Sequence, residues 1–446
     1  MAEKKLSVGQ MLGFGICDMG GNLFFTALGF WCLVYLTDTV GLSAALAGVA
    51  IMIGKLWDAV SDPLMGYLSD HTRSRWGRRR PYLLFGAIPL LLTMWLFFSN
   101  PHIQNQAFLT FWAIVALILL NTAYTVVNIP YSSLTPDLTT DYHERTTLNG
   151  YRFACAAVGT MLGAAAVQPI VEAFPSRSAG FSAVGIILGA VMAITSLITF
   201  FSTKERAVKD DMPKEKFLKS YLAVFKNKPY VILVLVYALN IVGLNFLQGI
   251  LVYYTKYIYM DESVTTIAML ILLVVAIICI PISVLVSKKI GKKRTYQVCF
   301  AILGSACLVI FFVGHLLGPN FFLAFMVYAG IGLGFGYAIP FSMLPDAIDF
   351  GKTQGGGRNE GTYYGMWTFV SKSGQALSIF LSGLILSVGG YVADAVQTAE
   401  TQFAIRLIIG PLPAVVLIAG LILLNFFPID EKMYNEMMSK KEVHGA

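Results

Sequence analysis

Apolar stretches long enough to cross a lipid bilayer recur along almost the whole chain. A transmembrane α-helix needs about 20 predominantly apolar residues, because each residue advances the helix by about 1.5 Å. Of the 446 residues, 57% are hydrophobic and 13% are charged, whereas soluble domains carry about 25% charged residues. We therefore predict an all-α polytopic membrane protein. Twelve transmembrane helices are expected, at residues 9–36, 42–69, 81–99, 107–135, 146–171, 180–202, 229–257, 263–287, 295–316, 321–347, 361–390 and 402–427.

The basic residues divide unevenly between the two sets of loops that twelve helices would create. The set that includes both termini holds almost all of the loop Lys and Arg residues, and the opposite set holds only Arg177 and Lys256. Loops rich in Lys and Arg stay in the cytoplasm. We therefore expect both termini to be cytoplasmic. The net charge of +7 is then a sign of topology, and no nucleic-acid partner is expected.

The chain also repeats itself at an offset of about 210–216 residues. Residues 129–132 (Ile-Pro-Tyr-Ser) match 339–342 (Ile-Pro-Phe-Ser), and residues 77–80 (Gly-Arg-Arg-Arg) match 291–294 (Gly-Lys-Lys-Arg). Parallel duplication of this kind is typical of major facilitator transporters, whose substrate site lies between the halves near the midplane of the membrane. We predict an N-terminal six-helix bundle, a cytoplasmic linker and a C-terminal six-helix bundle at residues 1–203, 204–228 and 229–446.

Two aspartates interrupt the second predicted helix. Asp58 and Asp62 are four residues apart, so both carboxylates leave the same face of a helix, about 6 Å from each other. Each costs roughly 2.5–3.5 kcal/mol to insert into hydrocarbon, which favours a position facing a wet or protein-lined interior. Such a pair can hold a proton or a small cation within the membrane. The alternative is a structural ion pair with Lys55, which lies on the same face.

A few other charged side chains lie away from the helix ends. Asp18, Arg152 and Lys372 fall inside predicted helices 1, 5 and 11. Together with Lys55 and the aspartate pair they balance to zero charge, as expected if they meet in one interior network. The charges can bind ligands or only join helices as ion pairs, and these two roles are compatible in a transporter.

Polar and aromatic side chains accompany these charges. Asn22 and Asn128 lie in helices 1 and 4, where their amides can bind sugar hydroxyls or only join helices. Thr368 shares one face of helix 11 with Lys372, and Trp367 is adjacent. A polar stripe beside an aromatic ring suits a pyranose, which has apolar faces and a rim of hydroxyls.

Several of these motifs together are similar to those of one transporter family. Residues 57–66 read Trp-Asp-Ala-Val-Ser-Asp-Pro-Leu-Met-Gly, and further matches lie at 72–77, 128–131, 151–153 and 346–351. They resemble the glycoside–pentoside–hexuronide:cation symporters of the major facilitator superfamily. The resemblance implies symport of a sugar or glycoside by alternating access, driven by Na⁺, H⁺ or Li⁺, in the plasma membrane. It implies no enzymatic activity.

The resemblance also implies roles for single residues. Asp58, Asp62 and Thr125 match the residues that bind the coupling cation, with Lys372 near them. Asn22 and Asn128 stand where a well-known member of the family has two acids that bind a galactoside. An anionic sugar such as a hexuronide, a pentoside and a β-glycoside all remain open. The predicted substrate-binding residues are Asp18, Asn22, Asn128, Arg152, Tyr337, Trp367 and Thr368.

Two other functions remain open. A carrier of a lysolipid or another amphiphile would need an apolar groove open to the membrane. A polytopic membrane enzyme would need a His, Ser or metal constellation near a helix end, which the sequence does not display. Apart from a Na⁺ ion at the aspartate pair, we expect no metal and no cofactor, because the five histidines lack ligand spacing. The expected partners are a small sugar and membrane lipids, and the protein is expected to act as a monomer.

Overall fold

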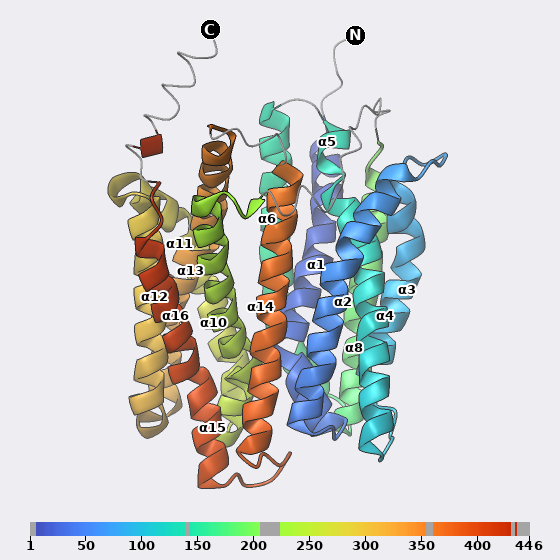
Figure 1. The fold of residues 1–446 in the computed structure, drawn as a ribbon. Helices are drawn as coiled ribbons and strands as arrows, with labels where there is room; N and C mark the ends of the chain where they lie inside the picture. Colours follow the sequence, from blue (N-terminus) through green and yellow to red (C-terminus); the bar gives the residue numbers. More distant parts are fainter. Residues whose placement is uncertain (1–5, 140–141, 206–223, 354–359, 430–432, 435–446) are drawn as a thin grey trace, which may run out of the picture. The chain divides into compact units, whose positions relative to one another are not determined.

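The computed structural model describes residues 6–139, 142–205, 224–353, 360–429 and 433–434, and within these ranges every regular element is a helix (Figure 1). They form two compact units, of which one comprises Met1–Asp211 with Ile379–Val396 and the other Met212–Ser378 with Gln397–Ala446. Most of the predicted linker, residues 206–223, lies outside the described residues.

The first unit is built from long helices that lie side by side (Figure 1). Helix α1 packs against α6 and α8, while α2 packs against α4, and α3 against α4 and α8. Small residues permit the closest of these approaches, because a Cβ added to Gly159 of α6 would lie 2.0 Å from the carbonyl oxygen of Met19 in α1. The elements of this unit are α1 (Val8–Val34), the π-helical turn η1 (Tyr35–Thr39), α2 (Ala44–His71), α3 (Arg80–Phe98), α4 (Gln106–Ser132), α5 (Thr135–Leu138), α6 (Tyr142–Ala165), α7 (Val167–Glu172) and α8 (Arg177–Ser202).

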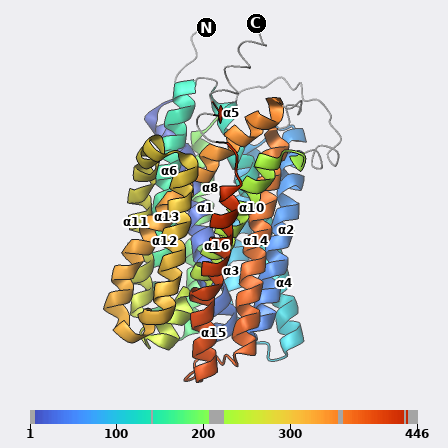
Figure 2. The same cartoon turned by 60° about the vertical axis from the view of Figure 1, so that its left-hand side comes forward.

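The second unit is likewise built from long helices that pack against one another. Helix α13 packs against α11 and α12, and α16 packs against α10 and α12 (Figure 2). Its core is apolar and aromatic, with Tyr230, Tyr296, Phe300 and Leu417 fully buried. Its elements are α10 (Lys228–Ile258), α11 (Ser263–Ile290), α12 (Lys292–Val309), the π-helical turn η2 (Ile310–Gly314), α13 (His315–Thr353), α14 (Glu360–Val388, of which the end belongs to the first unit), α15 (Ala399–Ile409) and α16 (Pro411–Asn425).

Eleven helical segments of the described chain are long and apolar enough to cross a membrane. Ten of them have 19–32 residues, but the segment Lys292–Gly351 has 60. Gly318 interrupts this long segment, because its φ of +77° and ψ of −177° are not helical. The two helices predicted at 295–316 and 321–347 meet at this point. The predicted all-α membrane architecture is thereby confirmed.

Two predicted helices are broken in the structure. The predicted helix 402–427 divides into α15 and α16 at Gly410, whose φ of −112° and ψ of −89° are followed by Pro411. The predicted helix 146–171 divides into α6 and α7 at Ala166. Transmembrane helices tolerate Gly and Pro, so a sequence pattern does not reveal which of them break the helix.

Candidate functional site

Asp58 and Asp62 lie one turn apart on α2, and α4 brings one hydroxyl to both of them. Thr125 Oγ1 is 3.0 Å from Asp58 Oδ1 and 3.0 Å from Asp62 Oδ1. Asp58 is 1% exposed and Thr125 is 2% exposed. Because each lies 3.0 Å from the same hydroxyl oxygen, Asp58 Oδ1 and Asp62 Oδ1 are separated by at most twice 3.0 Å. Since a hydroxyl carries one hydrogen, Thr125 donates to one carboxylate at a time and offers lone pairs to other ligands.

The packing of α2 on α4 holds this group of oxygens in place. The Asn121 side-chain amide of α4 donates to the carbonyl of Gly54 in α2 at 3.2 Å. A Cβ added to Gly54 would lie 3.0 Å from the Leu117 Cβ, so the two helices touch at this level. Directly after Asp62, Pro63 lacks the N–H that would bond the carbonyl of Ala59, which loosens the helical turn that carries both carboxylates.

This arrangement suits a small hard cation or a proton. Carboxylate and hydroxyl oxygens are the ligands that hard cations prefer. Two carboxylates so close to one hydroxyl repel each other strongly in a low-dielectric interior, and a positive charge between them removes this repulsion. The group is therefore chemically able to bind a small cation or a proton.

The two lysines predicted near the aspartates lie on different helices. Lys55 is on α2, one turn before Asp58, and its Nζ lies 5.3 Å from the centroid of the Phe25 ring in α1, a cation–π contact. Lys372 lies buried on α14, in the second unit. Its part in the cation site stays a prediction.

Asp18 and Arg152 form an ion pair, and the single network expected of all six buried charges stays a prediction. Arg152 Nε of α6 lies 2.6 Å from Asp18 Oδ2 of α1, and the Tyr131 hydroxyl of α4 donates to the same oxygen at 2.9 Å. The guanidinium also contacts the Thr135 hydroxyl at 3.2 Å and lies 5.1 Å from the Tyr131 ring centroid. Three helices of the first unit thus converge on a partly exposed ion pair. The sequence had given Tyr131 no role.

The two asparagines differ in their surroundings. The Asn22 amide donates to the Asp18 carbonyl of its own helix at 2.9 Å. Asn128 instead lines a cavity of about 10 Å³ together with Cys17, Gly21 and Tyr124. This volume holds about one water molecule. Tyr124, Asn128 and Tyr131 have the spacing i, i+4, i+7, so the sequence already carried a signal for a polar and aromatic face on α4.

The second unit holds the three remaining predicted sugar contacts. Tyr337 of α13 is 56% exposed, whereas Trp367 of α14 is 3% exposed. The Trp367 ring stacks on Tyr237 of α10, with centroids 4.0 Å apart and planes inclined by 16°. The Thr368 hydroxyl donates to the Tyr364 carbonyl of its own helix at 3.1 Å. In this structure Trp367 is part of the core, so its predicted sugar contact would require a change in packing.

Comparisons with known proteins decide the family. The model of a family described as "MFS/sugar transport protein" matches residues 13–431. The chain belongs to this family. The predicted membership of the glycoside–pentoside–hexuronide symporters is therefore confirmed, and the protein is an integral protein of the plasma membrane.

Single relatives agree with this assignment. The isoprimeverose transporter of Lactiplantibacillus pentosus is 30% identical, with 98% of this chain and 92% of the relative covered. The putative sulfoquinovose importer of Salmonella typhimurium is 28% identical, with 96% of this chain and 92% of the relative covered. The crystal structure of the nucleoside transporter NupG has a TM-score of 0.68 at 13% identity, covering 94% of this chain and 100% of that one. This last likeness concerns the fold alone. The relatives are transporters by name, and secondary transport of small molecules is the function they share.

Proposed function

We propose that this transporter is a cation-coupled symporter of a sugar or glycoside. The observation that carries the proposal is the Thr125 hydroxyl held between the Asp58 and Asp62 carboxylates. Paired carboxylates within a membrane helix are costly, and here Asp58 is buried and Asp62 is partly buried. A bound Na⁺ or H⁺ offsets that cost. Li⁺ has the same charge and ligand preference. Lys372 is assigned to the same site on the resemblance alone.

The proposed architecture is that of a duplicated carrier. Residues 1–203 and 229–446 form two six-helix halves joined by the linker 204–228, and both termini are cytoplasmic. If the segment Lys292–Gly351 crosses the membrane twice, the chain makes twelve crossings. A single 60-residue helix would be about three times longer than a bilayer needs, and Gly318 offers the turn between two crossings.

The sugar is proposed to bind beside the cation, near the Asp18–Arg152 pair. A carboxylate or sulfonate on the sugar would attract Arg152 away from Asp18, because the guanidinium binds such groups in a bidentate manner. The name of the sulfoquinovose importer among the relatives favours an anionic sugar, and that of the isoprimeverose transporter favours a neutral glycoside. Asn22, Asn128, Tyr337, Trp367 and Thr368 complete the proposed set of sugar contacts.

Coupling then follows from linkage. A cation bound between Asp58 and Asp62 favours the arrangement of helices that binds sugar, and the sugar must raise the affinity for the cation by the same factor. Transport by alternating access requires that the fully loaded and the empty carrier reorient, whereas the singly loaded carrier does so poorly.

A panel of sugars tests this function. The protein is reconstituted in vesicles, and uptake of hexuronides, sulfonated sugars, pentosides and β-glycosides is measured with a Na⁺, H⁺ or Li⁺ gradient imposed separately. We expect accumulation of one sugar class with at least one of the three gradients. Uptake that equilibrates a sugar but never concentrates it under any gradient would contradict symport.

A further inference from the structure

Backbone amides at the start of α3 bind the carboxylate of Glu205. Gly77 has a φ of +105°, and the chain after it turns so that three consecutive amides point to one place. The N–H groups of Arg78, Arg79 and Arg80 donate to the Glu205 carboxylate at 2.6, 2.8 and 2.6 Å. Amides at a helix start attract anions because they lack partners within the helix. At this helix start the anion is the Glu205 carboxylate of the same chain.

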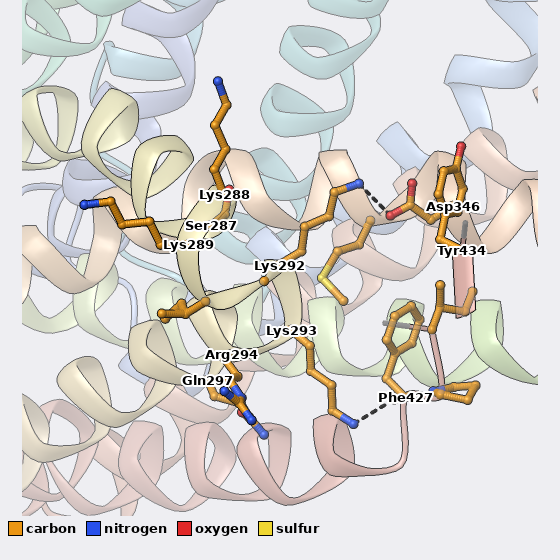
Figure 3. A pocket seen from close by; sticks show the side chains of 15 residues that line it. Ser287, Lys288, Lys289, Lys292, Lys293, Arg294, Gln297, Asp346, Phe427 and Tyr434 are labelled. Carbon is orange, nitrogen blue, oxygen red and sulfur yellow. Dashed lines mark hydrogen bonds and ion pairs between the residues drawn. The ribbon is translucent and has the colours of Figure 1, made fainter. Parts of the chain in front are cut away.

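The start of α12 is the matching place in the sequence repeat. Gly291 likewise has a positive φ, +84°, and it is followed by Lys292, Lys293 and Arg294. No side chain of the described residues caps this helix start. A pocket of about 740 Å³ lies here instead, within the second unit (Figure 3). The second copy of the motif thus has space where the first copy has a carboxylate.

The pocket is strongly basic. Five of its lining side chains are cationic and one, Asp346, is anionic. Lys292 Nζ lies 2.6 Å from Asp346 Oδ2, and the Lys293 ammonium donates to the Phe427 carbonyl at 2.8 Å (Figure 3). Lys293 also donates to the Asn425 carbonyl at 2.8 Å. The other three cations are exposed and have no ion-pair partner among the described residues. They are Lys288, Lys289 and Arg294.

The geometry points to a binding site for a phosphate-bearing anion in this pocket. Ammonium and guanidinium groups bind phosphate oxygens, and basic pockets at the cytoplasmic ends of transmembrane helices suit the headgroups of anionic lipids. Ile290, Met343 and Phe427 add apolar side chains to the lining of the pocket, and these suit the glycerol part of a phospholipid. A soluble phosphate would use the same cations. This ligand is distinct from the transported sugar, so its binding is tested without reference to transport.

Lipid binding to the purified full-length protein provides the test. Phosphatidylglycerol and phosphatidylcholine with identical acyl chains are titrated separately, and bound lipid is counted by native mass spectrometry. The pocket variant is Lys289→Gln/Arg294→Gln, because both side chains are exposed and neither has a hydrogen bond or ion pair within the described part of the chain. The matched control is Lys226→Gln/Lys228→Gln, which removes two exposed charges of the same unit outside the pocket.

We expect the wild type to prefer phosphatidylglycerol. The pocket variant should bind it roughly 30-fold more weakly, because each basic side chain near an anionic headgroup contributes about fivefold, and the control should bind as the wild type does. Displacement by millimolar inorganic phosphate would identify a soluble phosphate as the ligand, whereas resistance would identify the lipid. Equal affinity for both lipids, or equal loss in both variants, would overturn the proposal.

One further variant excludes an internal occupant. Asp430 and Glu431 follow the pocket residue Ile429 in the sequence and lie outside the described residues. If these carboxylates do not occupy the pocket, the variant Asp430→Asn/Glu431→Gln binds phosphatidylglycerol within about twofold of the wild type, because exposed charges away from a ligand are largely screened by salt. If lipid bound only after this replacement, the carboxylates of the chain itself would fill the pocket, and the proposed site would be wrong.

Discussion

The Thr125 hydroxyl joins two carboxylates that would otherwise only repel each other. Two substitutions separate the role of the hydroxyl from that of the rest of the Thr125 side chain. Thr125→Val keeps the shape and removes the hydroxyl, whereas Thr125→Ser keeps the hydroxyl. The hydroxyl oxygen offers its lone pairs to a cation between the carboxylates, and an interaction with a charged group contributes about 1.5–3 kcal/mol. Val should therefore weaken cation binding by about tenfold or more, and Ser should stay close to the wild type.

Titration of the purified protein with Na⁺, Li⁺ and H⁺, followed by calorimetry or intrinsic fluorescence, measures this effect. If Val and Ser bound every cation equally well, the hydroxyl would have no part in the site. The contrast between the two variants is informative because both replace the same buried side chain of α4.

Asn128 is the asparagine that faces a cavity, and Asn22 is the one that bonds its own helix. Asn128→Ala should therefore weaken sugar binding by roughly tenfold while leaving cation affinity within about twofold, since hydrogen bonds that are lost to a ligand leave its polar groups unpaired. Asn22→Ala should have a smaller effect on the sugar. Equilibrium binding of the transported sugar and of the cation measures the two affinities of each variant. Weaker cation binding by Asn128→Ala would instead assign Asn128 to the cation site.

At the scale of single elements, the contact of α1 with α6 depends on glycine. A Cβ at Gly159 would meet the Met19 carbonyl oxygen at 2.0 Å, so Gly159→Ala must push the helices apart, at a cost of about 1–3 kcal/mol. Gly150 lies on the same helix with nothing within 4 Å of an added Cβ. Gly150→Ala should be neutral or stabilise the helix by up to about 1 kcal/mol.

Thermal unfolding of the two purified variants compares them directly. A lower unfolding temperature for Gly159→Ala alone supports the packing of α1 on α6. Equal unfolding temperatures would show that the close contact is absent in the membrane protein.

How much the sequence predicted differs between elements. The helices and the shared face of Asp58 and Asp62 follow from apolar length, from their spacing of four residues and from the high cost of buried charge. The part of Thr125 was implied only by the resemblance to the symporter family. The break at Gly410 could not be predicted in this way, because a Gly within a transmembrane helix either bends the helix or packs against a neighbour. The burial of Trp367 was also missed, since a helix pattern does not tell which aromatic residue stacks on a ring such as Tyr237 of another helix.

Long-range partners were the least predictable part of the site. Glu205 was treated only as part of a charged linker, yet its carboxylate binds three backbone amides that are more than a hundred residues away. Tyr131 was part of a recognised motif, but its contact with Asp18 depends on how α4 and α1 pack. Sequence spacing within one helix carries no information on such contacts between helices.

At the scale of the whole molecule, the number of crossings is testable through the two termini. If Lys292–Gly351 crosses the membrane twice, twelve crossings put both termini on the cytoplasmic side, as the basic loops require. A green fluorescent protein fused to either end should fluoresce, and a periplasmic alkaline phosphatase fused to either end should be inactive. Opposite results at the two ends would mean an odd number of crossings and would contradict the duplicated architecture.

We propose that the aspartate pair couples the movement of a cation to that of a sugar. The most direct measurement compares gradient-driven accumulation with sugar counterflow in vesicles that carry the wild type, Asp62→Asn or Asp394→Asn. Asp394 lies in the first unit on an exposed loop, so its replacement controls for the loss of one carboxylate. We predict that Asp62→Asn loses accumulation and keeps counterflow, whereas Asp394→Asn keeps both. Normal accumulation of the sugar by Asp62→Asn would show that this carboxylate does not couple the cation to the sugar.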